Sequence, residues 1–351
     1  MNKLLFSAFL LLALSTIVVN TYGQVSNLSI DEVYDKYRDS LKTAPYPWIL
    51  PIMGAKVRKL GFDIPYPVGV MVTYGHSIQQ LTIDNLAVSF NPDNLVDVSS
   101  WARLQSMQAN VDAAVARVDF WLLPFLNVFG VVGRIRAVSN VHLGLPIDLK
   151  FNVTSEGTNA GWGAVVAGGV GPMVMTGNFV QNWTWTGALG KPSMTTLFDA
   201  RVGYMMRFRR KPDMNLVFLV GASYLGLSRE SSGSADLEKL VGITPEGKRE
   251  AADQLDAWYG ELTDPAQELL GGIYDGLSSW LRNDESSLLY YRFTKSLYYP
   301  ISMTVGVNYQ LNHRWMVNSI YTFLGSREQI TLSLNYRFGF RGKNFLEGLT
   351  L

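Results

Sequence analysis

Eleven charged residues share the polar face of segments that alternate polar and apolar side chains, and together they could guide anions. Eight of the eleven are Lys or Arg and three are Asp, so a passage that they line would carry net positive charge. Rings of Lys and Arg in a pore favour anionic solutes. The eleven residues are Arg117, Asp119, Arg134, Arg136, Asp148, Lys150, Asp199, Arg201, Arg207, Arg209 and Arg337.

A structural role for the same charges is equally open. Opposite charges such as Arg117 and Asp119, or Asp199 and Arg201, would brace a barrel by pairing with each other. A barrel of modest width can be filled by its own side chains. The sequence does not decide between a selective passage and an internal network of ion pairs.

Catalytic and metal-binding chemistry has little support. The chain has three histidines and no cysteine, which excludes disulfides and thiolate metal sites. His76 lies beside Ser77, but neighbouring residues on a strand point to opposite faces. There is no nucleophile elbow, phosphate loop or cluster of metal ligands. We therefore expect no enzymatic activity, no metal and no cofactor. A net charge of +1 with 17% charged residues gives no reason to expect nucleic-acid binding.

The elements that must position these charges are strands with one apolar and one polar face. The pattern alternates strictly over 301–310 and 330–338, and 315–323 is a looser copy between them. In a water-soluble sandwich the apolar face would pack inward, whereas in a transmembrane barrel it faces lipid and the polar face lines the interior.

The start of the chain favours the membrane interpretation. A short charged start is followed by an apolar run from Leu4 to Val19, and Thr21 and Gly23 are small enough for cleavage after Gly23. This is the pattern of an export signal over residues 1–23. The apolar run is short for a membrane-spanning helix, which needs about 20 residues. An exported chain that is 48% hydrophobic and rich in strands fits the outer membrane.

Strand counting predicts a barrel of about twelve strands within residues 63–339. Even numbers are typical of single-chain bacterial barrels. With the first strand starting in the periplasm, the long connection 228–298 falls outside the cell, but the twenty residues of 91–110 fall where a tight periplasmic turn is expected. The candidate strands are 66–74, 80–90, 111–121, 126–138, 140–153, 160–170, 173–186, 198–209, 215–227, 299–310, 314–323 and 328–338.

Parity within these strands predicts which side chains face lipid. Between Phe198 and Phe208 every second residue is apolar, so Asp199, Arg201 and Arg207 are assigned to the interior. The same reasoning places Arg134 and Arg136 inside, because a charge at the hydrocarbon midplane costs about 2 to 4 kcal/mol.

The long outer connection carries two helix signals. Thr244-Pro245 and Asp264-Pro265 each place an N-cap residue before a proline. Residues 236–285 contain twelve acidic and four basic residues. An acidic helical hairpin could fold over the basic interior as a lid, or its apolar stripes could pack on each other as a surface hairpin.

An amphipathic helix is expected before the barrel, over 30–42, within a periplasmic segment 24–62. The periodicity does not say whether it plugs the interior, covers the periplasmic opening or lies on the membrane surface. Phe338 is the kind of aromatic residue with which outer-membrane barrels end and which the barrel-assembly machinery reads, although a tail of residues 340–351 follows the barrel.

Three stretches, 61–74, 118–130 and 330–338, resemble a poorly characterised group of Gram-negative outer-membrane β-barrel proteins. The resemblance implies the barrel and its location in the cell outer membrane, and it implies no catalytic residue. We expect an all-β chain, an antiparallel transmembrane barrel in contact with outer-membrane lipid. The leading function is a porin-like channel or passive transporter for small solutes, anions included. The alternative is a non-conducting structural barrel whose acidic helical loop binds a partner.

Overall fold

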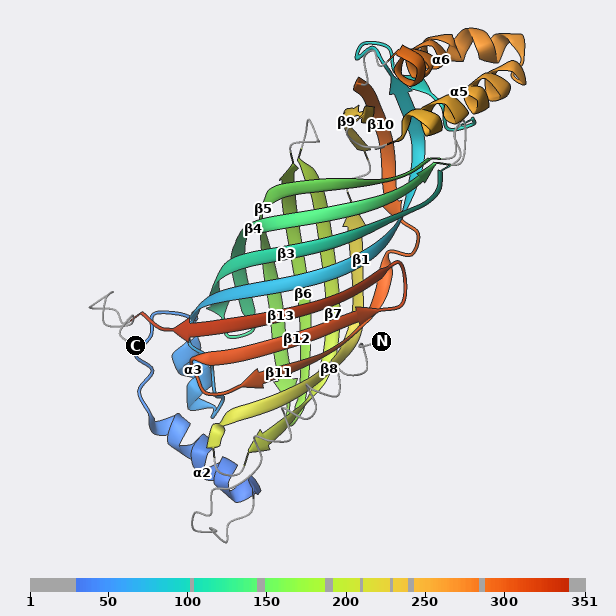
Figure 1. Ribbon diagram of the computed structural model, residues 1–351. Helices are drawn as coiled ribbons and strands as arrows, with labels where there is room; N and C mark the ends of the chain where they lie inside the picture. The colour runs from blue at the N-terminus through green and yellow to red at the C-terminus, as the bar shows by residue number, and fades with distance from the viewer. Residues whose placement is uncertain are drawn as a thin grey trace.

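The computed structural model describes residues 30–101, 104–143, 149–186, 192–208, 211–227, 230–238, 243–283 and 288–340. The predicted signal peptide and the last eleven residues lie outside these ranges. One antiparallel sheet closes on itself because β13 pairs with β1 (Figure 1). The ten strands of the closed barrel are β1 (Val68–Ser89), β3 (Leu104–Leu123), β4 (Leu126–Leu143), β5 (Leu149–Val170), β6 (Met173–Thr186), β7 (Ser193–Phe208), β8 (Lys211–Leu227), β11 (Ile301–Gln310), β12 (Trp315–Phe323) and β13 (Arg327–Phe338).

The barrel therefore has ten strands rather than the predicted twelve. The candidates 66–74 and 80–90 lie in one strand, β1, and the three candidates 126–138, 140–153 and 160–170 correspond to two strands, β4 and β5. About ten residues suffice to cross a bilayer, but β1 and β5 have 22 residues each, so they continue through polar sequence beyond the membrane. With the corrected count, the connection 90–103 lies at the same end of the barrel as the connection 228–298, which we call the outer end after the predicted orientation.

Three further strands extend the wall at the outer end. β9 (Glu230–Asp236) follows β8, β10 (Leu288–Leu297) precedes β11, and β2 (Val96–Asp97) pairs with the end of β1. The outer half of β1 pairs with β10, in register from Leu81 with Leu297, because β13 begins only at Arg327, opposite Gln79. The hairpin of β12 and β13 is thus shorter than its neighbours, and β10 takes its place beside β1.

Two helices stand on this extension. α5 (Pro245–Gly260) and α6 (Asp264–Asn283) confirm the two predicted helices, and the Thr244 hydroxyl accepts a hydrogen bond from the Gly247 N–H at 3.2 Å. Leu255 and Trp280 are buried between the helices, and Leu270 packs against residues of β1 and β2. Because the apolar stripes are covered in this way, the structure favours the surface hairpin over the lid (Figure 1).

The predicted N-terminal helix is present as α2 (Ile30–Thr43), and a shorter helix, α3 (Gly54–Lys59), follows it. Both lie at the inner end of the barrel, where β1 starts and β13 ends (Figure 1). Among the described residues, none of the helices has both the length and the hydropathy required to cross a membrane.

Candidate functional site

The first group of interior charges is built around Asp119 on β3. Its side chain is fully buried, and Oδ1 accepts hydrogen bonds from Arg337 Nη2 at 3.0 Å and from Asn127 Nδ2 at 2.6 Å. Arg117 Nη2 donates to Asn127 Oδ1 at 2.7 Å, while its Nε stays 3.8 Å from Asp119. Arg337 and Asp119 meet over Gly69, where a Cβ would lie 2.4 Å from the carboxylate. We call these residues the Asp119 brace.

The Asp119 brace joins four neighbouring strands and the lead-in segment. Arg337 belongs to β13, Gly69 to β1, Asp119 to β3 and Asn127 to β4. Arg337 Nε also donates to the Tyr66 carbonyl at 2.9 Å, which ties the brace to the chain just before β1. The brace therefore spans the seam at which the first and last strands close the barrel.

A second group surrounds Asp199 on β7, and we call it the Asp199 brace. Arg201 Nη2 lies 3.0 Å from Asp199 Oδ1, and Asn178 Nδ2 donates to Asp199 Oδ2 at 3.0 Å. Arg201 Nε reaches Thr304 on β11 at 3.4 Å. It crosses β8 at Gly221, where a Cβ would lie 2.8 Å from the Arg201 Cγ.

Arg327, at the start of β13, completes the Asp199 brace. Its Nη2 donates to Ser223 Oγ on β8 at 2.6 Å, and the bond is buried. β11 and β12 lie between these two strands in the sheet, so the side chain bridges non-adjacent parts of the wall. Sequence reasoning missed Arg327 because it assigned Gly325-Ser326-Arg327 to a turn.

The structure separates the eleven predicted residues into several groups. Arg117, Asp119, Asp199, Arg201 and Arg337 lie in the two braces. Asp148 and Arg209 lie outside the described residues, and so does the side chain of Lys150. The remaining three residues, Arg207, Arg134 and Arg136, lie elsewhere on the barrel.

Arg207 is at the inner end, where its guanidinium lies 4.5 Å from the ring of Tyr34 on α2.

The interior assignment of Arg134 and Arg136 is wrong. Arg134 is in register with Ala114, whereas inward-facing Arg117 is in register with Val131, so the two arginines of β4 have the outward parity. Both are exposed. The energetic argument for the interior assumed that every strand residue lies at hydrocarbon depth, and β4 extends beyond that depth.

The inner end of the barrel is tied to α2 by a polar cluster. Tyr34 donates to the Pro212 carbonyl at 2.7 Å, and Tyr37 donates to Asp63 Oδ2 at 2.9 Å. His313, in the connection between β11 and β12, lies 3.1 Å from both Asp63 Oδ2 and the Tyr37 hydroxyl. The hydrogen bond to Asp63 raises the pKa of His313, and burial raises the pKa of Tyr37.

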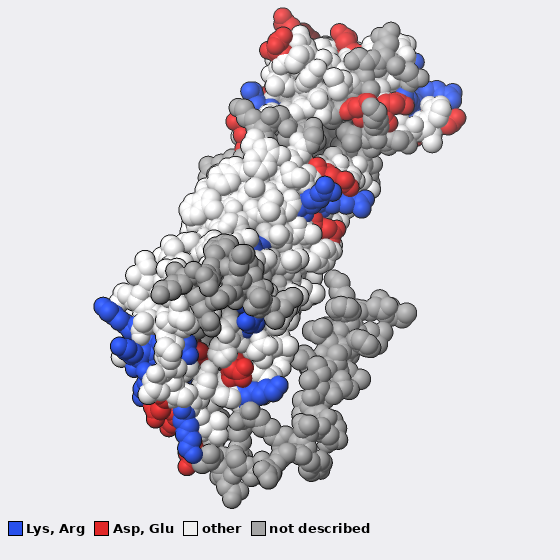
Figure 2. Space-filling view, turned by 90° about the vertical axis from the view of Figure 1, so that its left-hand side faces the viewer, with Lys and Arg blue, Asp and Glu red and all other residues white. Residues whose placement is uncertain are grey.

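The outward face of the strands is apolar. Along β7, the outward assignment is confirmed, since each of these side chains is more than a third exposed: Phe198, Val202, Tyr204, Met206 and Phe208. Figure 2 shows a broad uncharged wall between the charged inner end and the helical hairpin.

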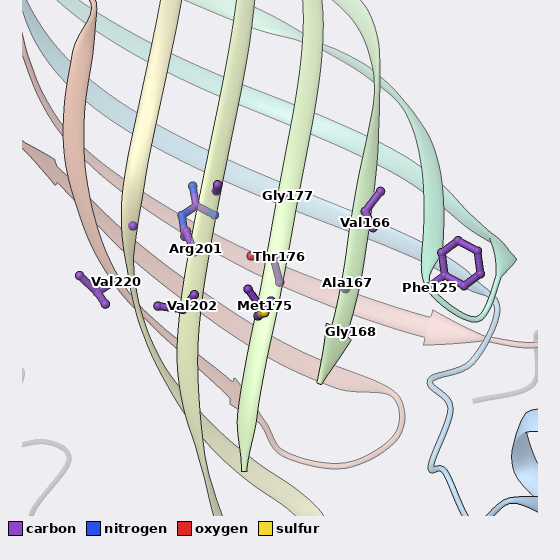
Figure 3. A pocket seen from close by; sticks show the side chains of 12 residues that line it. Phe125, Val166, Ala167, Gly168, Met175, Thr176, Gly177, Arg201, Val202 and Val220 are labelled. Carbon is purple, nitrogen blue, oxygen red and sulfur yellow. The ribbon is translucent and has the colours of Figure 1, made fainter. Parts of the chain in front are cut away.

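A shallow groove of about 570 Å³ on this wall has the same character. Figure 3 shows Val166, Met175 and Val202 around it, with Arg201 pointing to the other side of the sheet. Small residues such as Gly177 leave it open. We assign it to the apolar outer wall and not to the interior.

Aromatic rings border the apolar wall on both sides. An outer row runs from Trp162 through Phe179 and Phe198 to Tyr224, with centroids 5.3, 4.8 and 6.5 Å apart. Toward the inner end, Phe208 lies 6.3 Å from Tyr309, and Trp315 lies 4.8 Å from Tyr336. Phe198 and Phe208 are ten residues apart on β7, which is about 25 Å along the axis at about 3.3 Å per residue and a tilt of about 40°.

A closed sheet with an apolar belt of this height between two aromatic girdles is the construction that bacterial outer membranes hold. The protein is an outer-membrane β-barrel. Its outer wall meets lipid, and its paired charges face the interior.

Solved structures of similar architecture share little sequence with this barrel. It is similar to the beta domain of the Bordetella autotransporter BrkA, with 8% identity, coverage of 78% of this chain and 100% of that chain, and a TM-score of 0.36. It is also similar to the transport unit of the autotransporter AIDA-I from Escherichia coli, with 9% identity, coverage of 88% of this chain and 99% of that chain, and a TM-score of 0.31. An outer membrane channel from Pseudomonas putida F1 is 7% identical, with coverage of 78% of this chain and 96% of that chain and a TM-score of 0.30. We transfer no function from these likenesses.

Neither the protein-family models nor the curated proteins compared with the sequence gave a match.

The belt predicts where a charge is tolerated on the outer wall. Val202→Arg places a guanidinium within the belt and is expected to lower the free energy of unfolding in lipid vesicles by about 2 to 4 kcal/mol. Gln181→Arg is the control, because it adds the same group on the outward face beyond Phe179 and is expected to cost about 0 to 1 kcal/mol. Urea titrations of both variants measure the difference, and equal costs would contradict the belt.

The Asp119 brace predicts a large effect of one carboxylate. Asp119→Ala leaves Arg337 with an uncompensated buried charge, so we expect the free energy of unfolding to fall by about 3 to 5 kcal/mol. Asp93→Ala, at an exposed position in the outer connection, is expected to change it by less than about 0.5 kcal/mol. Urea unfolding followed by tryptophan fluorescence compares the two, and a small effect of Asp119→Ala would contradict the brace.

The His313 cluster predicts that docking of α2 weakens with rising pH. Because contact with Asp63 raises the pKa of His313, the protonated ring stabilises docking below its usual pKa, and this contribution is lost as the pH rises through the raised value. We expect faster hydrogen exchange in residues 30–43 at about pH 9 than at about pH 6, after correction for the intrinsic rate. His313→Gln should remove the difference in corrected exchange rate between the two pH values, and an unchanged pH dependence in this variant would refute the role of the histidine.

Proposed function

We propose that the protein is an outer-membrane barrel with a filled interior that conducts no solute freely and displays the acidic helical hairpin outside the cell. The observation that carries the proposal is the burial of the two braces. Asp119 is 0% exposed, Asp199 is 6% exposed, and Arg327 reaches across two intervening strands to Ser223. Side chains of a ten-stranded barrel can fill its interior, whereas wide aqueous channels occur in barrels of 16 to 18 strands.

Under this proposal, the functional part of the molecule is the extension that carries α5 and α6. Its balance of twelve acidic and four basic residues over 236–285 gives a net charge of minus eight. The helices are held rigidly, since Trp280 and Leu255 are both 1% exposed and Tyr259 stacks on Tyr274 with centroids 4.1 Å apart. A rigid acidic hairpin suits a partner with a basic surface, because complementary charge raises the rate of encounter.

A narrow anion-selective passage is the second candidate, and the charge of the braces supports it. The two braces contain four arginines, Arg117, Arg201, Arg327 and Arg337, against Asp119 and Asp199. An excess of cations in a confined interior favours anions over cations. This candidate requires a conducting path past the buried side chains.

Conductance in planar bilayers tests the proposal. We expect the folded wild-type barrel to be silent and Arg327→Ala to show intermittent current, because this change removes the side chain that joins β13 to β8. Replacing residues 245–283 by a short linker should leave the wild-type silence unchanged, since the braces lie within the barrel. A steady anion-selective current through the wild type would refute the filled interior and support the second candidate.

A further inference from the structure

Arg134 and Arg136 mark a second polar site, on the outside of the barrel. They follow Gly130 and Val132 on the outward face of β4. The outward side chains therefore change from apolar at Val132 to charged at Arg134, two residues later. Val132 is 59% exposed and belongs to the lipid-facing wall. Figure 2 shows charged residues interrupting the uncharged wall toward its outer end.

The two arginines lie at the depth of lipid headgroups. Tyr74 of β1 is opposite Ala114 on β3, and Ala114 is opposite Arg134 on β4, so the first arginine lies two strands from an exposed tyrosine on the same outward face. Two residues along a strand tilted by about 40° correspond to about 5 Å along the barrel axis. Arg134 therefore lies about 5 Å beyond Val132, on the headgroup side of the outer aromatic row that includes Trp162, and Arg136 lies further out.

One of the two negative charges of this site is engaged by Tyr74 and His76, and the other lies beside Arg136. Asp112 accepts hydrogen bonds from the Tyr74 hydroxyl at 2.8 Å and lies 2.8 Å from His76 Nδ1. Arg136 Nε lies 3.6 Å from Glu156 Oε1, and the two side chains are 63% and 71% exposed, which makes a weak contact. Within the described residues, Arg134 has no acidic partner.

The surface between these side chains is hollowed. A depression of about 480 Å³ lies over β3, β4 and β5, and its lining includes Tyr74, Asp112, Arg134, Arg136, Glu156 and Thr158. Arg134 is in register with Thr158, and Arg136 is in register with Glu156, so the two guanidinium groups border the depression from one strand. A planar guanidinium binds phosphate through paired hydrogen bonds.

The wall beside the depression is apolar and carries small residues. Three outward residues of β3 and β4 near this level, Ala114, Ala116 and Gly130, are small and exposed, and Val132, in register with Ala116, stands between Gly130 and Arg134. Larger side chains stand on both sides of them, Tyr74 on β1 and Trp162 on β5, which are 50% and 49% exposed. Ala114 also lines the depression, so small apolar residues of β3 continue the surface from the charged depression toward the lipid-facing wall.

We propose that this outward site binds a phosphorylated lipid of the outer leaflet, with phosphate on Arg134 and Arg136 and an acyl chain along Ala114 and Ala116. The apolar surface beside the charged depression favours an amphiphile over a soluble anion. The site is independent of the interior, because these residues have the parity opposite to the braces. It is therefore compatible with either function proposed for the barrel.

Binding of diphosphoryl lipid A to the full-length barrel in detergent tests this site. We expect the double variant R134Q/R136Q to lose at least about tenfold in affinity, since two charge-assisted contacts to phosphate are removed. Glu156→Gln is expected to raise the affinity about two- to fivefold, because it removes a negative charge beside the phosphate. Arg249→Gln, on α5 far from the site, is the control for a general loss of positive charge.

The probes separate the source of the phosphate. Inorganic pyrophosphate should bind at least about a hundredfold more weakly than the lipid, because it lacks the alkyl chain. Equal binding of the two would leave a plain anion site and overturn the lipid assignment. Equal affinities of R134Q/R136Q and Arg249→Gln would overturn the site itself, and near-native urea midpoints of all variants would show that they fold.

Discussion

The structure depends on one requirement, that every backbone N–H and C=O in the hydrocarbon has a partner within the sheet. Pairing of β1 with β13, continuous from Val68 with Phe338 to Gln79 with Arg327, meets this requirement by removing the open edges. Closure also fixes which side of each strand faces lipid. Once that side is set, the alternation of side chains assigns the braces to the interior and the aromatic girdles to the outer wall.

The braces show how a narrow interior can hold charges away from bulk water. Each carboxylate meets more than one donor, and the glycines Gly69 and Gly221 allow long arginine side chains to lie flat against the wall. Pairing across β1 also resists sliding of one strand past another, since a shift of two residues would separate Arg337 on β13 from Asp119 on β3. The interior charges thus act on register as well as on electrostatics.

Much of the fold can be predicted from the alternation of polar and apolar residues, and the wrong predictions of strand number and of side-chain orientation have a common physical cause. The period of two in 198–208 gave the correct lipid-facing side of β7, and the N-cap and proline pairs located α5 and α6. The strand count was too high because polar stretches such as 75–77 were read as turns, although a strand may continue into water. The same neglect of depth placed Arg134 and Arg136 inside. Arg327 was missed because contacts between distant strands leave no local pattern.

The short hairpin of β12 and β13 has a consequence for how the chain must assemble. The first strand offers a single edge to two different partners, β13 along its lower half and β10 along its upper half. Closure of the barrel therefore requires both β10 and β13, which are separated along the chain by β11 and β12. Before β13 has paired, only the upper half of this edge can be covered. The unpaired N–H and C=O groups of the lower half would then be free to pair with strands of other incompletely folded chains.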